Sequence, residues 1–271
     1  MYERIGSKVD CKQFLEIARD YKNGTNGVGV NFGESIRWYD IAIECGSAWA
    51  RIELISLLMD SQFRTEQYRS YIMAQRIYEN ENDVHWTEAA IRLARINRKG
   101  IGVDPDYKES SRIYAELIGK GNDSIQKEYI EFIYSKPDAI HSIEDVQCII
   151  DIDKENGYSG KTKAILSRIY KSGQFVDKDL SIAINYAKAA IKEGNEWSKI
   201  ELVTMLMGGN PIQQKEAVKT AHTYEKEMTG RLLYIVYEKL GIMYRKGIGV
   251  NVDEGLASKY ERLFKNNGVH E

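Results

Sequence analysis

The chain has 271 residues, of which 43% are hydrophobic and 29% are charged, and its formal net charge is −2. This composition excludes a disordered chain, because 18 Tyr and 4 Trp carry too much apolar surface to remain in water. The small net charge gives no overall bias toward nucleic acid or a membrane surface, and no uncharged apolar run of about 18 residues predicts a membrane span.

One segment recurs along the chain. Residues 17–24, 93–100, 166–173 and 240–247 share a large residue, then a small one, a tyrosine or asparagine three places later, and a final glycine. A valine follows each segment, at Val28, Val103, Val176 and Val250, and these positions differ by 75, 73 and 74. Weaker copies begin at residues 55, 130 and 202. The spacing therefore indicates a repeat of about 37 residues.

Each repeat predicts two antiparallel helices, and no stretch alternates as a β-strand does. One pair is too small to bury its own apolar face, so the pairs must stack. We therefore predict an all-α fold, a single right-handed α-solenoid over residues 1–271. The seven predicted pairs occupy residues 10–46, 47–83, 84–121, 122–157, 158–194, 195–228 and 229–267.

Glycines and capping residues predict the helix boundaries. In the odd-numbered pairs the first helix ends at a left-handed glycine, namely Gly24, Gly100, Gly173 or Gly247. Asp104–Pro105 and Asn210–Pro211 are the residue pairs expected at the start of a second helix. Later glycines close second helices, at Gly46, Gly121, Gly157 and Gly194.

Cysteine usage favours a reducing compartment. Cys11, Cys45 and Cys148 are an odd number without the spacing of a disulfide framework. The first eight residues also lack the apolar core of a secretory signal. We therefore predict a cytoplasmic location. Cys11 and Cys45 fall at the two ends of one predicted helix pair, so a disulfide between them stays open.

The repeated motif, Leu-Gly/Ala-x-x-Tyr-x-x-Gly-x-Gly-Val, resembles the Sel-one-like repeat, a relative of the tetratricopeptide repeat. The resemblance covers nearly the whole chain and is strong in the first, third, fifth and seventh pairs. The even-numbered pairs lack the Gly-x-Gly-Val turn. The resemblance implies a protein-interaction adaptor in signalling, protein quality control or the assembly of cell-envelope polysaccharides.

Motifs for catalysis or metal binding are weak. The Gly-x-Gly turns follow no strand and lack the third glycine of a dinucleotide fingerprint. Three His-x-x-Glu pairs occur, but they fall at different places in different repeats, so they are not expected to converge on one metal. The pairs are His85/Glu88, His141/Glu144 and His222/Glu225. We predict no enzymatic activity, no cofactor and no metal.

The related tetratricopeptide architecture implies that the first helices line a concave groove. Carried onto this chain, its groove positions in odd-numbered pairs are mostly basic: Arg19, Lys22, Arg95, Arg98, Lys99, Arg168, Lys171, Arg245 and Lys246. Even-numbered pairs contribute Leu57, Phe132 and Trp197. These cations either form a basic ladder for a partner or stabilise helix C-termini, and the dipole explains Arg19, Arg95 and Arg168 less well.

The leading hypothesis is therefore a non-catalytic scaffold that holds an extended protein partner or acidic peptide in the groove. The alternative is a component of a cell-envelope polysaccharide pathway that binds an anionic glycan or its assembly enzymes. Neither hypothesis involves nucleic acid or membrane insertion.

Overall fold

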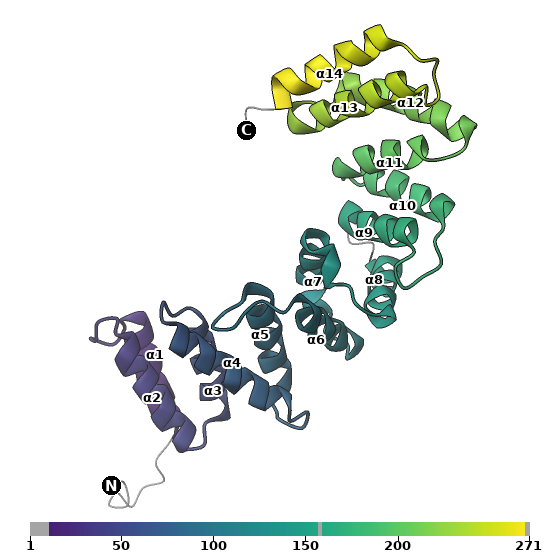
Figure 1. The fold of residues 1–271 in the computed structure, drawn as a ribbon. Helices are drawn as coiled ribbons and strands as arrows, with labels where there is room; N and C mark the ends of the chain where they lie inside the picture. Colours follow the sequence, from purple (N-terminus) through teal and green to yellow (C-terminus); the bar gives the residue numbers. More distant parts are fainter. Residues whose placement is uncertain (1–10, 157–158, 269–271) are drawn as a thin grey trace, which may run out of the picture. The chain divides into compact units, whose positions relative to one another are not determined.

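The structure is a computed structural model that describes residues 11–156 and 159–268. Within those ranges it contains fourteen α-helices, two short 3-10 helices and no strand (Figure 1). The predicted all-helical fold with two helices per repeat is confirmed. The helices are α1 (Cys11–Asn23), α2 (Phe32–Glu44), α3 (Ala48–Met59), α4 (Arg64–Tyr78), α5 (Trp86–Lys99), α6 (Tyr107–Gly119), α7 (Gln126–Ser135), α8 (Ile143–Asn156), α9 (Ser159–Ser172), α10 (Leu180–Lys192), α11 (Trp197–Met207), α12 (Pro211–Glu227), α13 (Gly230–Lys246) and α14 (Glu254–Gly268).

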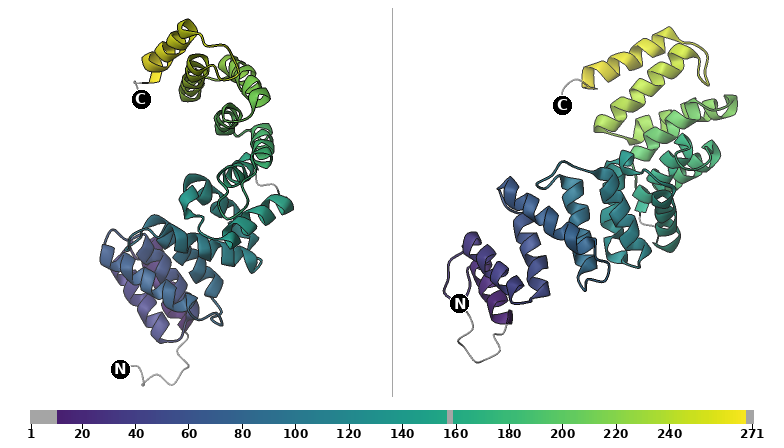
Figure 2. Two further views of the ribbon diagram at one scale, coloured as in Figure 1. Left: turned by 45° about the vertical axis from the view of Figure 1, so that its right-hand side comes forward. Right: turned by 60° about the horizontal axis from the view of Figure 1, so that its bottom comes forward.

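The helices gather into two compact units. The first comprises Met1–Tyr129 and Asp138–His141, and the second comprises Ile130–Pro137 and Ser142–Glu271. Within each unit, helices that are consecutive in the chain pack against each other (Figure 2), for example α1 on α2, α2 on α3, α9 on α10 and α13 on α14. Helix α7 is divided between the two units. The single solenoid over residues 1–271 stays a prediction.

Small residues let the two helices of a pair approach closely. The Ser35 hydroxyl of α2 donates to the Ala18 carbonyl of α1 at 2.8 Å, and Ser110 of α6 donates to the Ala94 carbonyl of α5 at 2.9 Å. In α9 the direction is reversed, because Ser167 donates to Ala183 of α10. All of these side chains are buried. The large–small pattern in the sequence thus marks the crossing within these three pairs.

The predicted helix ends are confirmed at four glycines with left-handed backbone. The φ angles are 70° at Gly24, 68° at Gly100, 76° at Gly173 and 66° at Gly247, and each residue follows the last residue of its helix. Gly157, the expected end of a second helix, lies outside the described residues.

One predicted helix start is confirmed and one is wrong. Asn210 caps α12 with Pro211 in its first turn. Helix α6 begins two residues later than predicted, because Asp106 rather than Asp104 accepts the capping hydrogen bond from the Glu109 backbone.

The turn within a pair is shorter in the second and sixth pairs than in the third and seventh. In the third and seventh pairs the two helices are joined by residues 100–106 and 247–253, whereas residues 60–63 and 208–210 suffice in the second and sixth. The long turns reach back to the preceding pair. A Cβ added at Gly102 would lie 2.3 Å from the Tyr68 backbone nitrogen of α4, and one at Gly249 would lie 2.2 Å from the Gln214 carbonyl oxygen of α12. Each long turn therefore lies flat on the first two turns of the preceding second helix.

The first pair is closed by a disulfide between Cys11 and Cys45, whose Cα atoms are 5.5 Å apart. It joins the start of α1 to the residue that caps α2. The sequence left open whether Cys11 and Cys45 are free or bonded, and the structure contains the bond. Cys148 is a free, partly buried thiol. No helix among the described residues is long and apolar enough to cross a membrane.

Candidate functional site

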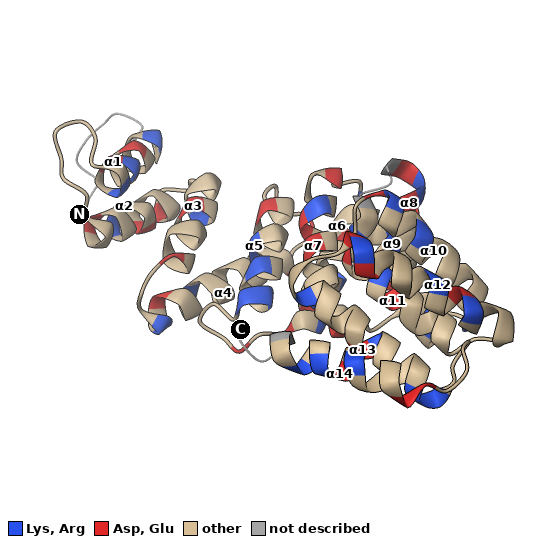
Figure 3. Ribbon diagram, turned by 90° about the horizontal axis from the view of Figure 1, so that it is seen from above, with Lys and Arg blue, Asp and Glu red and all other residues tan. Residues whose placement is uncertain are grey.

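The three arginines of the predicted basic ladder are paired with glutamates of the next repeat. Arg19 bonds Glu53 through Nε at 3.0 Å, Arg95 bonds Glu128 through Nη2 at 2.6 Å, and Arg168 bonds Glu201 through Nε at 2.7 Å. In each case the glutamate lies on the first helix of the following pair. Figure 3 shows basic and acidic segments mixed along the helices, with a basic C-terminal half on α5.

A tyrosine completes two of these pairs. Tyr39 of α2 donates to Glu53 at 2.9 Å, and Tyr114 of α6 donates to Glu128 at 2.8 Å. The eighth residue of α10, in the place of these tyrosines, is Ala187, and one buried oxygen of Glu201 has no hydrogen-bond partner in the described chain. The Arg–Glu–Tyr arrangement is therefore a repeated contact between neighbouring pairs.

Burial alone would raise the pKa of Glu53 and Glu128, but hydrogen bonds from the arginine and the tyrosine outweigh it. The net result is a lowered pKa for both carboxyl groups. Both glutamates are thus held ionised against their arginines. Arg19, Arg95 and Arg168 are each paired with a carboxylate of the next pair rather than of their own, and their role as a binding surface stays a prediction.

These carboxylates predict acid sensitivity. A carboxyl group with a lowered folded-state pKa stabilises the fold at pH values above its ordinary value of 4.5 and loses that contribution as pH falls below it. Glu128→Gln should therefore lower the free energy of unfolding at pH 7 by about 1 kcal/mol, a value between those of exposed and buried pairs. The free energy of unfolding of this variant, measured by urea unfolding, should also fall less steeply than that of the parent as the pH is lowered toward 3.

The matched control is Glu131→Gln, on the same helix, because the Glu131 side chain is 48% exposed and pairs with Lys161 across the surface. Parallel pH profiles for the parent and Glu128→Gln would show that the Arg95–Glu128 pair contributes nothing to stability.

The other predicted groove positions differ in their availability. Arg98 also pairs with Glu128, at 2.9 Å, and Arg245 bonds Glu261 at 2.7 Å and Glu254 at 2.9 Å. Leu57 and Phe132 are buried in the core, whereas Trp197 is 37% exposed. The four lysines among the predicted groove positions, Lys22, Lys99, Lys171 and Lys246, form no ion pair with any residue in the described ranges.

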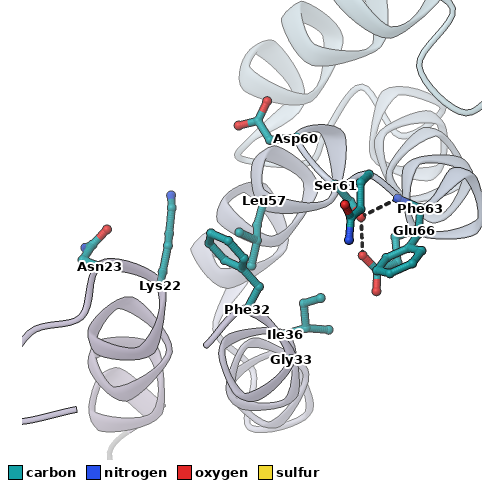
Figure 4. A pocket seen from close by; sticks show the side chains of 11 residues that line it. Lys22, Asn23, Phe32, Gly33, Ile36, Leu57, Asp60, Ser61, Phe63 and Glu66 are labelled. Carbon is teal, nitrogen blue, oxygen red and sulfur yellow. Dashed lines mark hydrogen bonds between the residues drawn. The ribbon is translucent and has the colours of Figure 1, made fainter. Parts of the chain in front are cut away.

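A hollow of about 700 Å³ opens between the first two pairs, within the first unit. Phe32 and Phe63, both in its lining, are each 57% exposed although they are large and apolar. Its full lining is Lys22, Asn23, Phe32, Gly33, Ile36, Leu57, Asp60, Ser61, Gln62, Phe63 and Glu66. Figure 4 shows Lys22 and Asn23 on one side, Ser61, Phe63 and Glu66 on the other, and Phe32 with Leu57 between them.

The hollow exists because the turn of the second pair is short. Residues 60–63 do not extend over α2 as residues 100–106 extend over α4. The turn is held by its own bonds, since the Ser61 hydroxyl accepts from the Phe63 backbone at 3.0 Å and donates to Glu66 at 2.5 Å. Of this lining, Lys22, Asn23 and Leu57 are at groove positions carried over from the tetratricopeptide architecture. The missing Gly-x-Gly-Val turn was the available signal.

Histidines take part in local contacts. His222 lies between Glu225 and the Tyr244 hydroxyl, at 2.9 and 3.0 Å, and so links α12 to α13. His85 approaches Glu88 at 3.9 Å, and His141 lies 3.3 Å from the Ala139 carbonyl. No group of three or more His, Cys, Asp or Glu side chains suited to a metal occurs in the part of the chain that the structure describes.

Comparison with known proteins identifies the repeat. The Sel1 repeat model matches residues 17–47, 87–121, 164–195 and 237–260, which are the four odd-numbered pairs. A search of curated proteins finds no match.

Two solved structures share the fold. One is a protective antigen present in uropathogenic Escherichia coli strains that displays an SLR fold, with a TM-score of 0.51, 19% identity, and coverage of 96% of this chain and 54% of that chain. The other is a Sel1 repeat protein from Oxalobacter formigenes, with a TM-score of 0.51, 16% identity, and coverage of 96% and 73%. This chain thus spans about half the length of the Escherichia coli protein.

Proposed function

Since four segments of this chain match the Sel1 repeat, we propose that it is a non-catalytic scaffold that binds a segment of a protein partner in the hollow between its first two helix pairs. Sel1-repeat proteins generally act as scaffolds for protein interactions. The observation that carries the proposal is the pair of exposed phenylalanines, Phe32 and Phe63, in the lining of a hollow of about 700 Å³. Aromatic side chains beside a pocket are typical anchors of protein interfaces.

The charged groups refine this proposal. The hypothesis that an acidic partner binds the arginine ladder is weakened, because Arg19, Arg95 and Arg168 are each paired with a glutamate of the chain. The anionic-glycan alternative rested on the same ladder and is weakened equally. The unpaired lysines stay candidates for contacts with a partner, and Lys22 lies at the hollow itself.

The disulfide bears on the compartment. Disulfides persist in oxidising compartments and are rare in the cytosol. The Cys11–Cys45 bond therefore favours an oxidising environment. The cytoplasmic prediction rested partly on cysteines that were expected to be unpaired, and two of the three are bonded.

The proposal is tested by capture of partners from an extract of the organism that makes the protein, quantified by mass spectrometry. The double variant Phe32→Ser/Phe63→Ser should lose the captured partner by about tenfold or more, since truncating an interface anchor costs 2 kcal/mol or more. Ile212→Ser is the matched control, because Ile212 is 79% exposed in the first turn of α12. A partner retained equally by both variants would exclude the hollow as the binding site.

A further inference from the structure

The chain itself contains two examples of what binds to the start of a second helix. The turn of residues 100–106 lies on α4, with Gly102 against the backbone of Gln67 and Tyr68, the fourth and fifth residues of that helix. The turn of residues 247–253 lies on α12 in the same register, with Gly249 against Gln214 and Lys215, again the fourth and fifth residues. A glycine is required at these contacts, because any Cβ would overlap the helix backbone.

Helix α2 has no long turn on its start. Its fourth residue, Ser35, is buried against α1, and its fifth residue, Ile36, lines the hollow. Its second residue, Gly33, also lines the hollow, and a Cβ added there would meet only the Asn31 side-chain oxygen, at 3.5 Å. The first turn of α2 is therefore open where α4 and α12 are covered.

We propose that the hollow is a seat for a glycine-containing turn of the protein partner, and that this turn carries an aliphatic and a basic side chain. The inference rests on the proposed function and specifies the partner's chemistry. The turn would occupy the place that the short linker of residues 60–63 leaves empty on α2, in the way that residues 100–106 occupy α4.

The lining dictates the two side chains. Phe32, Ile36 and Leu57 form an apolar surface that an aliphatic side chain covers, much as Ile248 and Val250 of the seventh turn pack against the core of their own unit. Asp60 and Glu66 place two carboxylates at the hollow against the single ammonium group of Lys22. A basic side chain on the partner would complement this excess of negative charge. The turn of residues 100–106 also forms an ion pair with the helix beneath it, but there the turn supplies the acidic residue, Asp104, and α4 supplies Arg64, at 3.3 Å.

A turn graft tests the seat directly. Replacing residues 60–62 with the sequence of residues 100–106 keeps Phe63, and it should fill the hollow from within the chain and abolish capture of the partner. The matched control places the same seven residues in the linker of residues 208–210, next to α10 in the second unit. That variant should capture the partner as the parent does.

A peptide probe removes the dependence on grafting. Two cyclic peptides with the sequence of residues 99–106 are titrated against the labelled full chain, one unchanged and one with Asp104→Lys. Backbone NMR shifts of Gly33, Ile36 and Asp60 should respond, and the lysine peptide should bind more tightly by about threefold or more, a gain that falls as salt screens the charges. Gly33→Leu should weaken binding by about tenfold, whereas Gly255→Leu, also at the second position of its helix, should not.

The outcomes separate the two proposals. A peptide that binds Gly33→Leu as well as the parent, or a graft that still captures the partner, would overturn the turn seat. If capture nonetheless depends on Phe32 and Phe63, the scaffold proposal stands. Capture that survives the graft and the double phenylalanine variant alike would overturn both.

Discussion

Gly102→Ala should destabilise the first unit by about 2–5 kcal/mol. Its φ of 71° is left-handed, which costs an alanine about 1–2 kcal/mol, and overpacking typically adds about 1–3 kcal/mol. The clash is with backbone, because the added Cβ would lie 2.3 Å from the Tyr68 nitrogen and 2.4 Å from the Gln67 carbonyl carbon. Neither atom can move without shifting α4. Urea unfolding followed by circular dichroism measures the change.

Gly27→Ala is the control for the backbone contribution. Gly27 also has a left-handed φ, 83°, but nothing lies within 4 Å of the Cβ it would gain. Gly27→Ala should lower the free energy of unfolding only by the cost of the left-handed backbone, about 1–2 kcal/mol. Equal effects of the two substitutions would mean that the turn of residues 100–106 does not contact α4 closely. The proposed binding of a partner's turn to α2 would then have no precedent at α4.

Removing the disulfide should destabilise the first helix pair by about 3–4 kcal/mol, the range expected for a bond that closes a loop of this length. The bond spans a sequence separation of 34 and fastens the start of α1 to the end of α2. Apart from this bond, α1 is held by a small buried set that includes Leu15, Ala18 and Tyr39. Cys11→Ser/Cys45→Ser should therefore lower amide hydrogen-exchange protection in α1 and α2 most strongly.

The comparison is with Cys148→Ser, which removes a free thiol and leaves the bond intact. Helices α9 to α14 should keep their protection in both variants. If a reducing agent leaves exchange in α1 unchanged, the bond contributes nothing to the stability of the pair. Loss of α1 would also remove Lys22 from the hollow, so partner capture should weaken together with the exchange protection.

Features that depend on neighbouring residues in the chain could be predicted from the sequence. The helix pairs, their period and the glycine ends follow from local periodicity and from the left-handed backbone that glycine alone adopts easily. The close crossing of each pair is similarly local, since Ser35 meets Ala18 only one helix away. The start of α6 was misplaced because two aspartates flank Pro105, and only the folded turn selects Asp106 as the cap.

The state of the basic residues was decided by contacts between pairs. Glu53, Glu128 and Glu201 follow Arg19, Arg95 and Arg168 by 34, 33 and 33 residues, a regular spacing that the sequence contains. The spacing alone does not say that the two first helices face each other with these side chains between them. Assigning the arginines to an open groove was therefore reasonable from the repeat, yet the neighbouring helix supplies their counter-charges.

The hollow likewise depends on tertiary structure. The sequence determined that the even-numbered pairs lack the Gly-x-Gly-Val motif, and in the second and sixth pairs the turn is also short. Only the fold reveals that a long turn covers the second helix of the pair before it, because that contact joins residues about 35 positions apart, such as Gly102 and Tyr68. A short turn in one pair therefore exposes Phe32 in another, and this exposure depends on stacking, which local sequence does not specify.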